Sequence, residues 1–135
     1  MIGRTDPRFA ALTVLLVEDD GFALRLAQSI LRNLGIGVIL TARDGEEAIR
    51  ILESESTKVD LIVSDWNMPK LSGLDLLRHV RKTWHNMPFL MLTGRASEDF
   101  VLAAREYGVN AYIVKPFSPE QLLRKILSVF NMPPR

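Results

Sequence analysis

The sequence predicts an α/β fold in which a parallel β-sheet is covered by helices on both faces. Five short apolar runs alternate with five longer segments of helical periodicity along the 135 residues. The runs are almost continuously apolar, as expected for strands that are buried on both faces. Right-handed crossovers between parallel strands place the intervening helices on the two sides of the sheet. A chain of this length fits one compact domain with one core.

Each predicted strand is a short apolar run that ends near a polar or turn-forming residue. The five runs are Val14–Val17, Val38–Leu40, Leu61–Val63, Phe89–Leu92 and Ala111–Val114. Ala42 and Asp65 extend the second and third runs, and Pro88 precedes the fourth. Their lengths and apolar content favour strands over helices.

Most of the predicted helices begin after a residue whose side chain can accept a hydrogen bond from a free backbone N–H group. These opening residues are Asp20, Asp44, Ser97 with Asp99, and Ser118, which Pro119 follows in the first turn. The third helix follows the loop NMPKLSG. The expected helices cover residues 21–34, 45–55, 74–84, 98–108 and 120–130.

Two helices show a clear apolar face. In the first, one stripe carries Phe22, Leu26, Ile30 and Leu34, and Gly35 ends the helix. In the second, the expected buried face consists of Ala48, Ile49 and Leu52. This periodicity is typical of helices that pack one side against a sheet.

The composition excludes several function classes. Seventeen basic residues against sixteen acidic ones leave a net charge of +1, so no bulk electrostatic attraction to nucleic acid or a membrane surface is expected. Without cysteine the chain has no disulfide and no thiolate ligand, which suits a cytoplasmic location. Asp6, Pro7 and Arg8 interrupt the region where a secretory signal needs an apolar stretch, and no segment has the length of a membrane span.

Five polar or charged side chains fall at or just after strand ends. They are Glu18, Asp19, Asp65, Thr93 and Lys115. Open parallel sheets bind ligands beyond the carboxyl ends of their strands, so these side chains are expected to converge there. Mg²⁺ is usually held by one or two carboxylates together with a phosphate. The sequence therefore predicts a magnesium-assisted phosphate site.

These residues resemble the receiver domains of two-component response regulators, and especially the stand-alone chemotaxis type. The likeness runs from about Thr13 to Phe130, which leaves a short leader at 1–12 and a tail at 131–135. It rests on four motifs in this order: VEDD, SDWNMP, LTG and YIVKPF. Each motif alone is modest, and their order and spacing together are specific. The resemblance implies a flavodoxin-like fold with strand order 2-1-3-4-5.

The same resemblance implies that Asp65 accepts a phosphoryl group from the phosphohistidine of a partner kinase. Glu18, Asp19, Asp65 and the backbone carbonyl of Asn67 would hold Mg²⁺. Many receivers carry two aspartates where this chain has Glu18 and Asp19, and the longer glutamate would hold the ion either directly or through water. Asp20 is better explained as the N-cap of the first helix.

The remaining roles also follow from the resemblance. Lys115 would offset charge on the phosphoryl oxygens, and the bond to Pro116 is expected to be cis. Thr93 and Tyr112 would form the switch, in which the threonine hydroxyl moves towards phosphate and the aromatic ring rotates. An alternative interpretation stays open for each of these three residues. Lys115 would then be a surface lysine, Thr93 would be an ordinary strand-end residue, and Tyr112 would be a half-buried aromatic residue without a role.

Asn67 and Arg95 lie two positions beyond the acceptor and the threonine. There they are expected to set the lifetime of the acyl phosphate by blocking or ordering the attacking water. A solvated surface arginine remains an open alternative for Arg95.

The expected partners are a sensor histidine kinase or phosphotransfer protein and a downstream protein target. The target would bind the face formed by the fourth helix, fifth strand and fifth helix. No direct contact with nucleic acid and no membrane insertion are expected. The chain is then a phosphoacceptor that assists its own phosphorylation and dephosphorylation, rather than an enzyme.

Rival functions fit the residues less well. A nucleotide-binding enzyme needs a glycine-rich loop after the first strand, where this chain has EDDGFALRL. A flavin carrier needs a hydroxyl-rich and amide-rich loop there, and an aspartate phosphatase needs a second carboxylate where Asn67 lies. Two alternatives stay open: a receiver excised from a larger regulator or hybrid kinase, and an interaction module that acts without phosphorylation.

Overall fold

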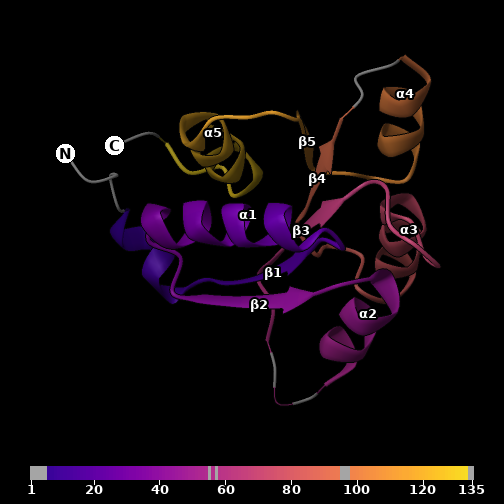
Figure 1. Cartoon of the computed structure of the whole chain (residues 1–135), viewed down its shortest axis with the longest axis horizontal. Coiled ribbons are helices and arrows are strands. Elements are labelled where there is room, and N and C mark those ends of the chain that lie inside the picture. Colours follow the sequence, from indigo (N-terminus) through magenta and orange to yellow (C-terminus); the bar gives the residue numbers. More distant parts are fainter. Residues whose placement is uncertain (1–5, 55, 57, 95–97, 134–135) are drawn as a thin grey trace.

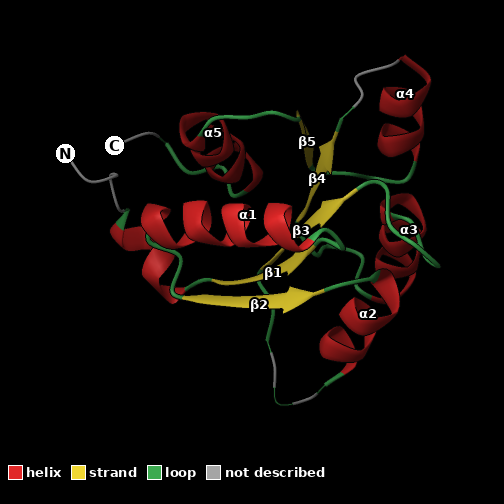
Figure 2. Ribbon diagram, viewed as in Figure 1, coloured by secondary structure: helices red, strands yellow, loops and turns green. Residues whose placement is uncertain are grey.

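The computed structural model shows a five-stranded parallel sheet with helices on both faces (Figure 1, Figure 2). It describes all residues except 1–5, 55, 57, 95–97 and 134–135. The strands lie in the order β2-β1-β3-β4-β5, as the resemblance implies. Their bounds are β1 Thr13–Val17, β2 Val38–Ala42, β3 Leu61–Asp65, β4 Phe89–Thr93 and β5 Ala111–Val114. The predicted fold class is confirmed.

Two helices cover one face of the sheet and three cover the other (Figure 1). On the first face lie α1 Gly21–Leu34 and α5 Pro119–Val129. On the second lie α2 Gly45–Glu53, α3 Gly73–Thr83 and α4 Glu98–Glu106. The central strands are apolar because both of their faces are buried, as in β4, where every residue is buried.

Strand register brings the functional strand ends to one edge of the sheet. Asp65 at the end of β3 pairs with Leu92, and Thr93 at the end of β4 pairs with Val114. Lys115 directly follows β5. The carboxyl ends of neighbouring parallel strands therefore place their polar residues side by side.

The helix caps follow local chemistry. The Asp20 carboxylate accepts a hydrogen bond from the Ala23 backbone N–H at 2.8 Å, which confirms it as the N-cap of α1. Asp44 caps α2, and Ser118 forms a capping box with Gln121 in α5. Ser72, which the sequence analysis leaves in a loop, caps α3. The predicted cap Ser97 lies outside the described residues.

The predicted core stripe of α1 is only partly correct. Leu34 is buried, but Phe22 is 69% exposed and Leu26 is 53% exposed. The helix instead buries Ala27 and Leu31 against the sheet and α5. Apolar residues occupy two adjoining stripes of this helix, so periodicity alone does not tell which stripe is covered.

A short 3-10 helix, Pro7–Ala11, lies within the expected leader. Its Phe9 is completely buried in the core cluster of the α1 and α5 face. The Phe9 carbonyl accepts a hydrogen bond from Gly37 N–H, and the Arg8 guanidinium donates to the Pro133 carbonyl at 2.8 Å. Residues before β1 and residues after α5 thus pack with the rest of the domain.

None of the helices in the described part of the chain has the length and apolar content that a bilayer crossing requires.

Candidate phosphoacceptor and metal site

Three carboxylates converge at the carboxyl edge of the sheet. Each of Glu18, Asp19 and Asp65 offers one carboxylate oxygen, and these oxygens all lie within 4.8 Å of one another. Glu18 and Asp65 are buried, at 3% and 8% exposure, while Asp19 is half-buried. The two neighbouring strand ends β1 and β3 supply the cluster. Repulsion among buried carboxylates is costly unless a cation lies between them.

Lys115 supplies such a cation. Its ammonium donates to Asp65 Oδ1 at 2.7 Å and to Glu18 Oε1 at 2.9 Å. Burial alone lowers the pKa of Lys115, but its two carboxylate partners together raise that pKa above the usual value. Burial raises the pKa of Glu18, although the hydrogen bond from Lys115 opposes that rise. Lys115 therefore stays charged and holds the two strand ends together.

Backbone hydrogen bonds fix the segment around Asp65. Ser64 Oγ donates to the Asp65 carbonyl at 3.0 Å, and Trp66 N–H donates to the Leu92 carbonyl at 2.8 Å. Trp66 in turn accepts from Gly73 N–H at 2.8 Å. The β3–α3 connection is thus tied to β4 and to the first residue of α3. These contacts hold the backbone of Asp65 and Trp66 in place.

Gly73 has no room for a side chain. A Cβ at this position would collide with the Asp65 carbonyl oxygen and would lie 2.9 Å from Trp66 Cα. Both are backbone atoms, which move only if the β3–α3 connection moves with them. The close approach of α3 to the acceptor segment therefore requires glycine.

We expect Gly73→Ala to lower the free energy of unfolding by about 1–3 kcal/mol, as in other overpacked sites. Gly21→Ala is the matched control, because Gly21 also begins a helix beside the site and its Cβ would meet only Arg25 at 3.4 Å. That control should be neutral or up to about 1 kcal/mol stabilising. Urea unfolding measures both variants. Equal stability of the two would show that the backbone at Asp65 yields freely.

The other predicted residues lie at varying distances from the acceptor. Thr93 is buried at the end of β4, and its carbonyl accepts from Lys115 N–H at 2.7 Å. The Lys115–Pro116 bond is cis, the isomer that the resemblance implies. Asn67 is exposed and Tyr112 is half-buried. Arg95 lies outside the described residues, so its predicted role stays a prediction.

Arg43 is a neighbour of the site that the sequence analysis misses. Its guanidinium donates to the Asp19 carbonyl at 3.1 Å, and its backbone N–H donates to Glu47 Oε1 at 2.6 Å. The sequence does contain information that points to Arg43, because Arg43 follows the end of β2 and β2 lies beside β1. That information can be used only when the strand order is known before individual residues are assigned to the site.

An apolar groove of about 320 Å³ begins at the site and runs along α1. Glu18 and Lys115 line its polar end, and Phe22, Leu26 and Phe117 are among its apolar lining residues. The exposed stripe of α1 is therefore the wall of a groove that opens beside Glu18 and Lys115.

The donor set of the acidic cluster fits a hard divalent cation. It offers oxygen ligands only, with no nitrogen or sulfur donor among the three clustered residues. Mg²⁺ binds proteins in this manner, through one or two carboxylates with water and phosphate completing the octahedron. The cluster can therefore hold such an ion next to Asp65.

Comparisons with known proteins identify the family of this chain. Residues 14–127 match the response regulator receiver domain family. The chemotaxis protein CheY of Pseudomonas aeruginosa is 39% identical over 122 residues, which cover 89% of this chain and 97% of that protein. Chemotaxis protein CheY-3 of Vibrio cholerae is 36% identical over 89% of this chain and 92% of its own length.

Solved structures show the same fold. The chemotaxis response regulator CheY4 of Vibrio cholerae superposes with a TM-score of 0.80 at 32% identity, over 87% of this chain and 98% of that chain. The CheX-CheY-BeF3-Mg+2 complex from Borrelia burgdorferi gives a TM-score of 0.83 at 29% identity, over 88% of this chain and 89% of that chain. The chain therefore belongs to the response regulator receiver domain family.

Proposed function

We propose that this protein is a response regulator that accepts a phosphoryl group on Asp65 from the phosphohistidine of a kinase or phosphotransfer protein. The observation that supports this most strongly is the convergence of Glu18, Asp19 and Asp65 with the Lys115 ammonium at one sheet edge. A structural ion pair needs no third carboxylate, whereas phosphoryl transfer needs both a nucleophile and cationic partners.

The reaction is a displacement at phosphorus. A carboxylate oxygen of Asp65 forms a new P–O bond while the P–N bond to the donor imidazole breaks, and the imidazole keeps the bonding electrons and takes up a proton. Lys115 remains protonated and turns its ammonium from the Asp65 oxygen to the phosphoryl oxygens. Hydrolysis removes the phosphoryl group from Asp65: water attacks phosphorus, the P–O bond to Asp65 breaks, and inorganic phosphate leaves.

Glu18, Asp19, Asp65 and the Asn67 carbonyl would hold Mg²⁺, with Glu18 acting directly or through water. When bound, the ion supplies positive charge that offsets repulsion between the carboxylate nucleophile and the phosphoryl oxygens. The raised pKa of Lys115 keeps its ammonium charged for the same purpose. The site residues thus provide charge compensation and orientation, the two main requirements of phosphoryl transfer.

Incubation with acetyl phosphate tests the proposal directly. Intact-mass measurement should show one added phosphoryl group on the wild type in the presence of Mg²⁺, little without it, and none on Asp65→Asn. A stable product on the wild type that persists in Asp65→Asn would place the modification elsewhere. The absence of any product at saturating Mg²⁺ would favour an interaction module that acts without phosphorylation.

The chemotaxis relatives support a signalling role through a protein partner. We propose that phosphorylation changes the surface formed by α4, β5 and α5, and that a downstream protein reads this surface. Thr93 at the end of β4 and Tyr112 on β5 are the residues through which the phosphoryl group would act on it. The Borrelia burgdorferi complex shows a CheY protein bound to another protein, CheX.

The groove along α1 is the proposed contact for the phosphodonor protein. A donor must bring its phosphohistidine to Asp65, and the groove leads from that site to Phe22 and Leu26, whose apolar side chains are largely exposed. An apolar helix face of the donor would cover both side chains while its histidine reaches the acceptor. Continuity with the phosphorylation site thus favours the donor over the downstream target.

Phe22→Ser should therefore slow transfer from the kinase that proves fastest in a phosphotransfer screen by about 5-fold or more. Phosphorylation by acetyl phosphate should stay unchanged, because Phe22 is not part of the acidic cluster. Leu102→Ser is the control, since Leu102 is 53% exposed on α4, away from the groove. Equal slowing by the two substitutions would argue against donor docking along α1.

A further inference from the structure

Three aromatic rings contact one another in series between the phosphoacceptor segment and β5. Trp66 directly follows Asp65, and its ring centroid lies 4.1 Å from that of Phe100 with the planes at 73°. The centroid of Phe100 lies 6.1 Å from that of Tyr112, at 71°. Both contacts are edge-to-face; the Phe100–Tyr112 separation lies within the range that aromatic pairs favour, and Trp66 and Phe100 are closer still.

Phe100 is the middle member of this series and comes from α4. It is 7% exposed and belongs to the core cluster on the α2, α3 and α4 face. Trp66 and Tyr112 are half-buried and pack against the same cluster. Because protein interiors are close-packed, a ring held between two others cannot move without its neighbours.

The backbone connects Trp66 to the acceptor rigidly. Its N–H donates to the Leu92 carbonyl and its carbonyl accepts from Gly73 N–H, each at 2.8 Å. These bonds leave the indole side chain as the part of Trp66 that can respond, and one peptide bond separates it from Asp65. On the far side of the series, Lys125 of α5 places its ammonium 5.8 Å from the centre of the Tyr112 ring.

We propose that Phe100 is a positioning residue that transmits the phosphorylation state of Asp65 to Tyr112 through Trp66, as a route separate from Thr93. The inference rests on the proposed phosphorylation of Asp65. Movement of Trp66 shifts Phe100 and the start of α4, and the Tyr112 ring then changes its position relative to Lys125. The output surface thereby receives one signal through the Thr93 hydroxyl and a second through packed rings.

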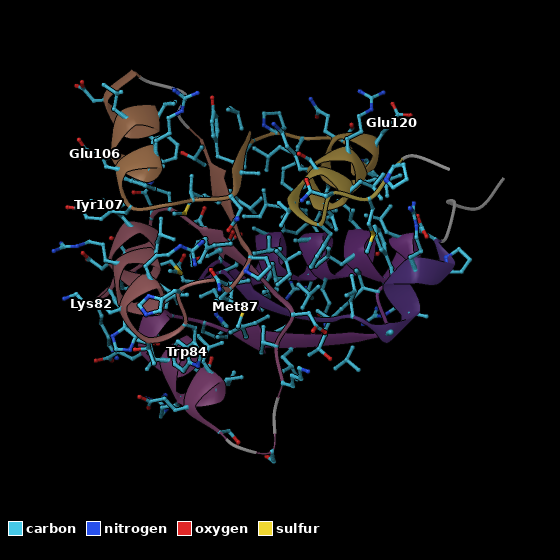
Figure 3. The ribbon with its side chains drawn as sticks, turned by 180° about the vertical axis from the view of Figure 1, so that it is seen from behind. Lys82, Trp84, Met87, Glu106, Tyr107 and Glu120 are labelled. Carbon is cyan, nitrogen blue, oxygen red and sulfur yellow. The ribbon has the colours of Figure 1, made fainter. Side chains whose placement is uncertain are left out.

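The chain suits a direct test because it contains two tyrosines, Tyr107 and Tyr112. Labelling with 3-fluorotyrosine gives two ¹⁹F signals, which Tyr107→Phe assigns. Tyr107 directly follows α4 and lies beside α3 (Figure 3), with the Arg78 guanidinium 5.0 Å from its ring centre, so it serves as the internal reference. Beryllofluoride with Mg²⁺ stands in for the phosphoryl group, and its own bound ¹⁹F signal reports occupancy of Asp65.

In the wild type, saturation with beryllofluoride should shift the Tyr112 signal and leave that of Tyr107 nearly unchanged. Phe100→Leu, which keeps an apolar side chain without a ring, should bind beryllofluoride and lose a substantial part of the Tyr112 shift. Thr93→Ala should also lose part of it, and the double variant should lose almost all. Phe130→Leu is the control, because Phe130 packs in the other core cluster and should keep the full shift.

The outcomes distinguish a failure of the aromatic route from a failure of the proposed phosphorylation of Asp65. A full Tyr112 shift in Phe100→Leu at saturation, or complete loss in Thr93→Ala alone, overturns the aromatic route while phosphorylation stands. If the wild type shows no bound beryllofluoride signal, the proposed function fails and this inference fails with it. Should Phe100→Leu not fold, as judged by the Tyr107 signal, Phe100→Met replaces it and is held to the same criterion.

Discussion

Replacing Lys115 by methionine is expected to slow phosphorylation of Asp65 by acetyl phosphate about 10²–10³-fold, the usual effect of removing one group that stabilises transition-state charge. Methionine keeps the unbranched apolar stem and removes only the ammonium. That ammonium bonds to both Asp65 and Glu18 in the resting protein. Its loss would leave the phosphoryl oxygens without the cationic partner that follows β5.

The same substitution should strengthen Mg²⁺ binding. The single Lys115 ammonium bonds to two of the three clustered carboxylates and offsets one unit of their negative charge, so it competes electrostatically with a divalent ion. Without it the cluster keeps more negative charge and attracts the ion more strongly. Opposite changes in ion affinity and transfer rate are expected when a residue acts in the chemical step rather than in assembling the site.

Calorimetric titration with Mg²⁺ and time-resolved intact mass measure the two quantities on the same samples. Lys82→Met is the control, because Lys82 is an exposed lysine on α3 and should change neither quantity. Phosphorylation of Lys115→Met at the wild-type rate would show that Lys115 takes no part in the transfer.

Asp19→Asn is expected to weaken Mg²⁺ binding by at least about 10-fold, since even residues behind the direct ligands contribute 10–100-fold to metal affinity. Asp19 is the most exposed of the three clustered acids, and its carboxylate lies within 4.8 Å of the other two ligand atoms. Asparagine keeps the shape and one carbonyl oxygen but loses the charge. Phosphorylation of the variant should therefore require much higher Mg²⁺ concentrations.

Asp20→Asn provides the closest control in the chain. Asp20 is the next residue, but its carboxylate caps α1 by accepting from Ala23 N–H, and asparagine caps helices equally well. Fluorescence of Trp66, beside the acceptor, measures binding in a Trp84→Phe background, because the chain has two tryptophans. Similar Mg²⁺ affinities for the two variants would mean that Asp19 does not hold the ion.

The sequence predicts that Glu18, Asp19, Asp65 and Lys115 meet at one edge of the sheet, because each of them follows or ends a predicted strand. In parallel sheets the carboxyl ends of neighbouring strands meet at one edge, so residues after the apolar runs had to approach one another. Glu18, Asp19, Asp65 and Lys115 are brought together in this way. Caps such as Asp20 and Ser118 are equally local, since each bonds to a backbone N–H within its own first turn.

Features that depend on packing between distant segments were not predictable in the same way. The exposure of Phe22 and Leu26 follows from where the sheet and α5 lie relative to α1, which periodicity does not encode. The 3-10 helix around Phe9 is too short to give a periodic signal. The contact of Trp66 with Phe100 joins the residue after β3 to α4, and its residue types alone do not distinguish it from ordinary core packing.

A crystal structure of the protein with Mg²⁺ and beryllofluoride would decide whether this corner of the sheet is a phosphorylation site. We expect one Mg²⁺ ion bound by Asp19, Asp65 and the Asn67 carbonyl, with beryllofluoride on Asp65 in contact with Lys115 and Thr93. An empty corner at saturating ligand, with the Glu18, Asp19 and Asp65 side chains pointing apart into solvent, would contradict it.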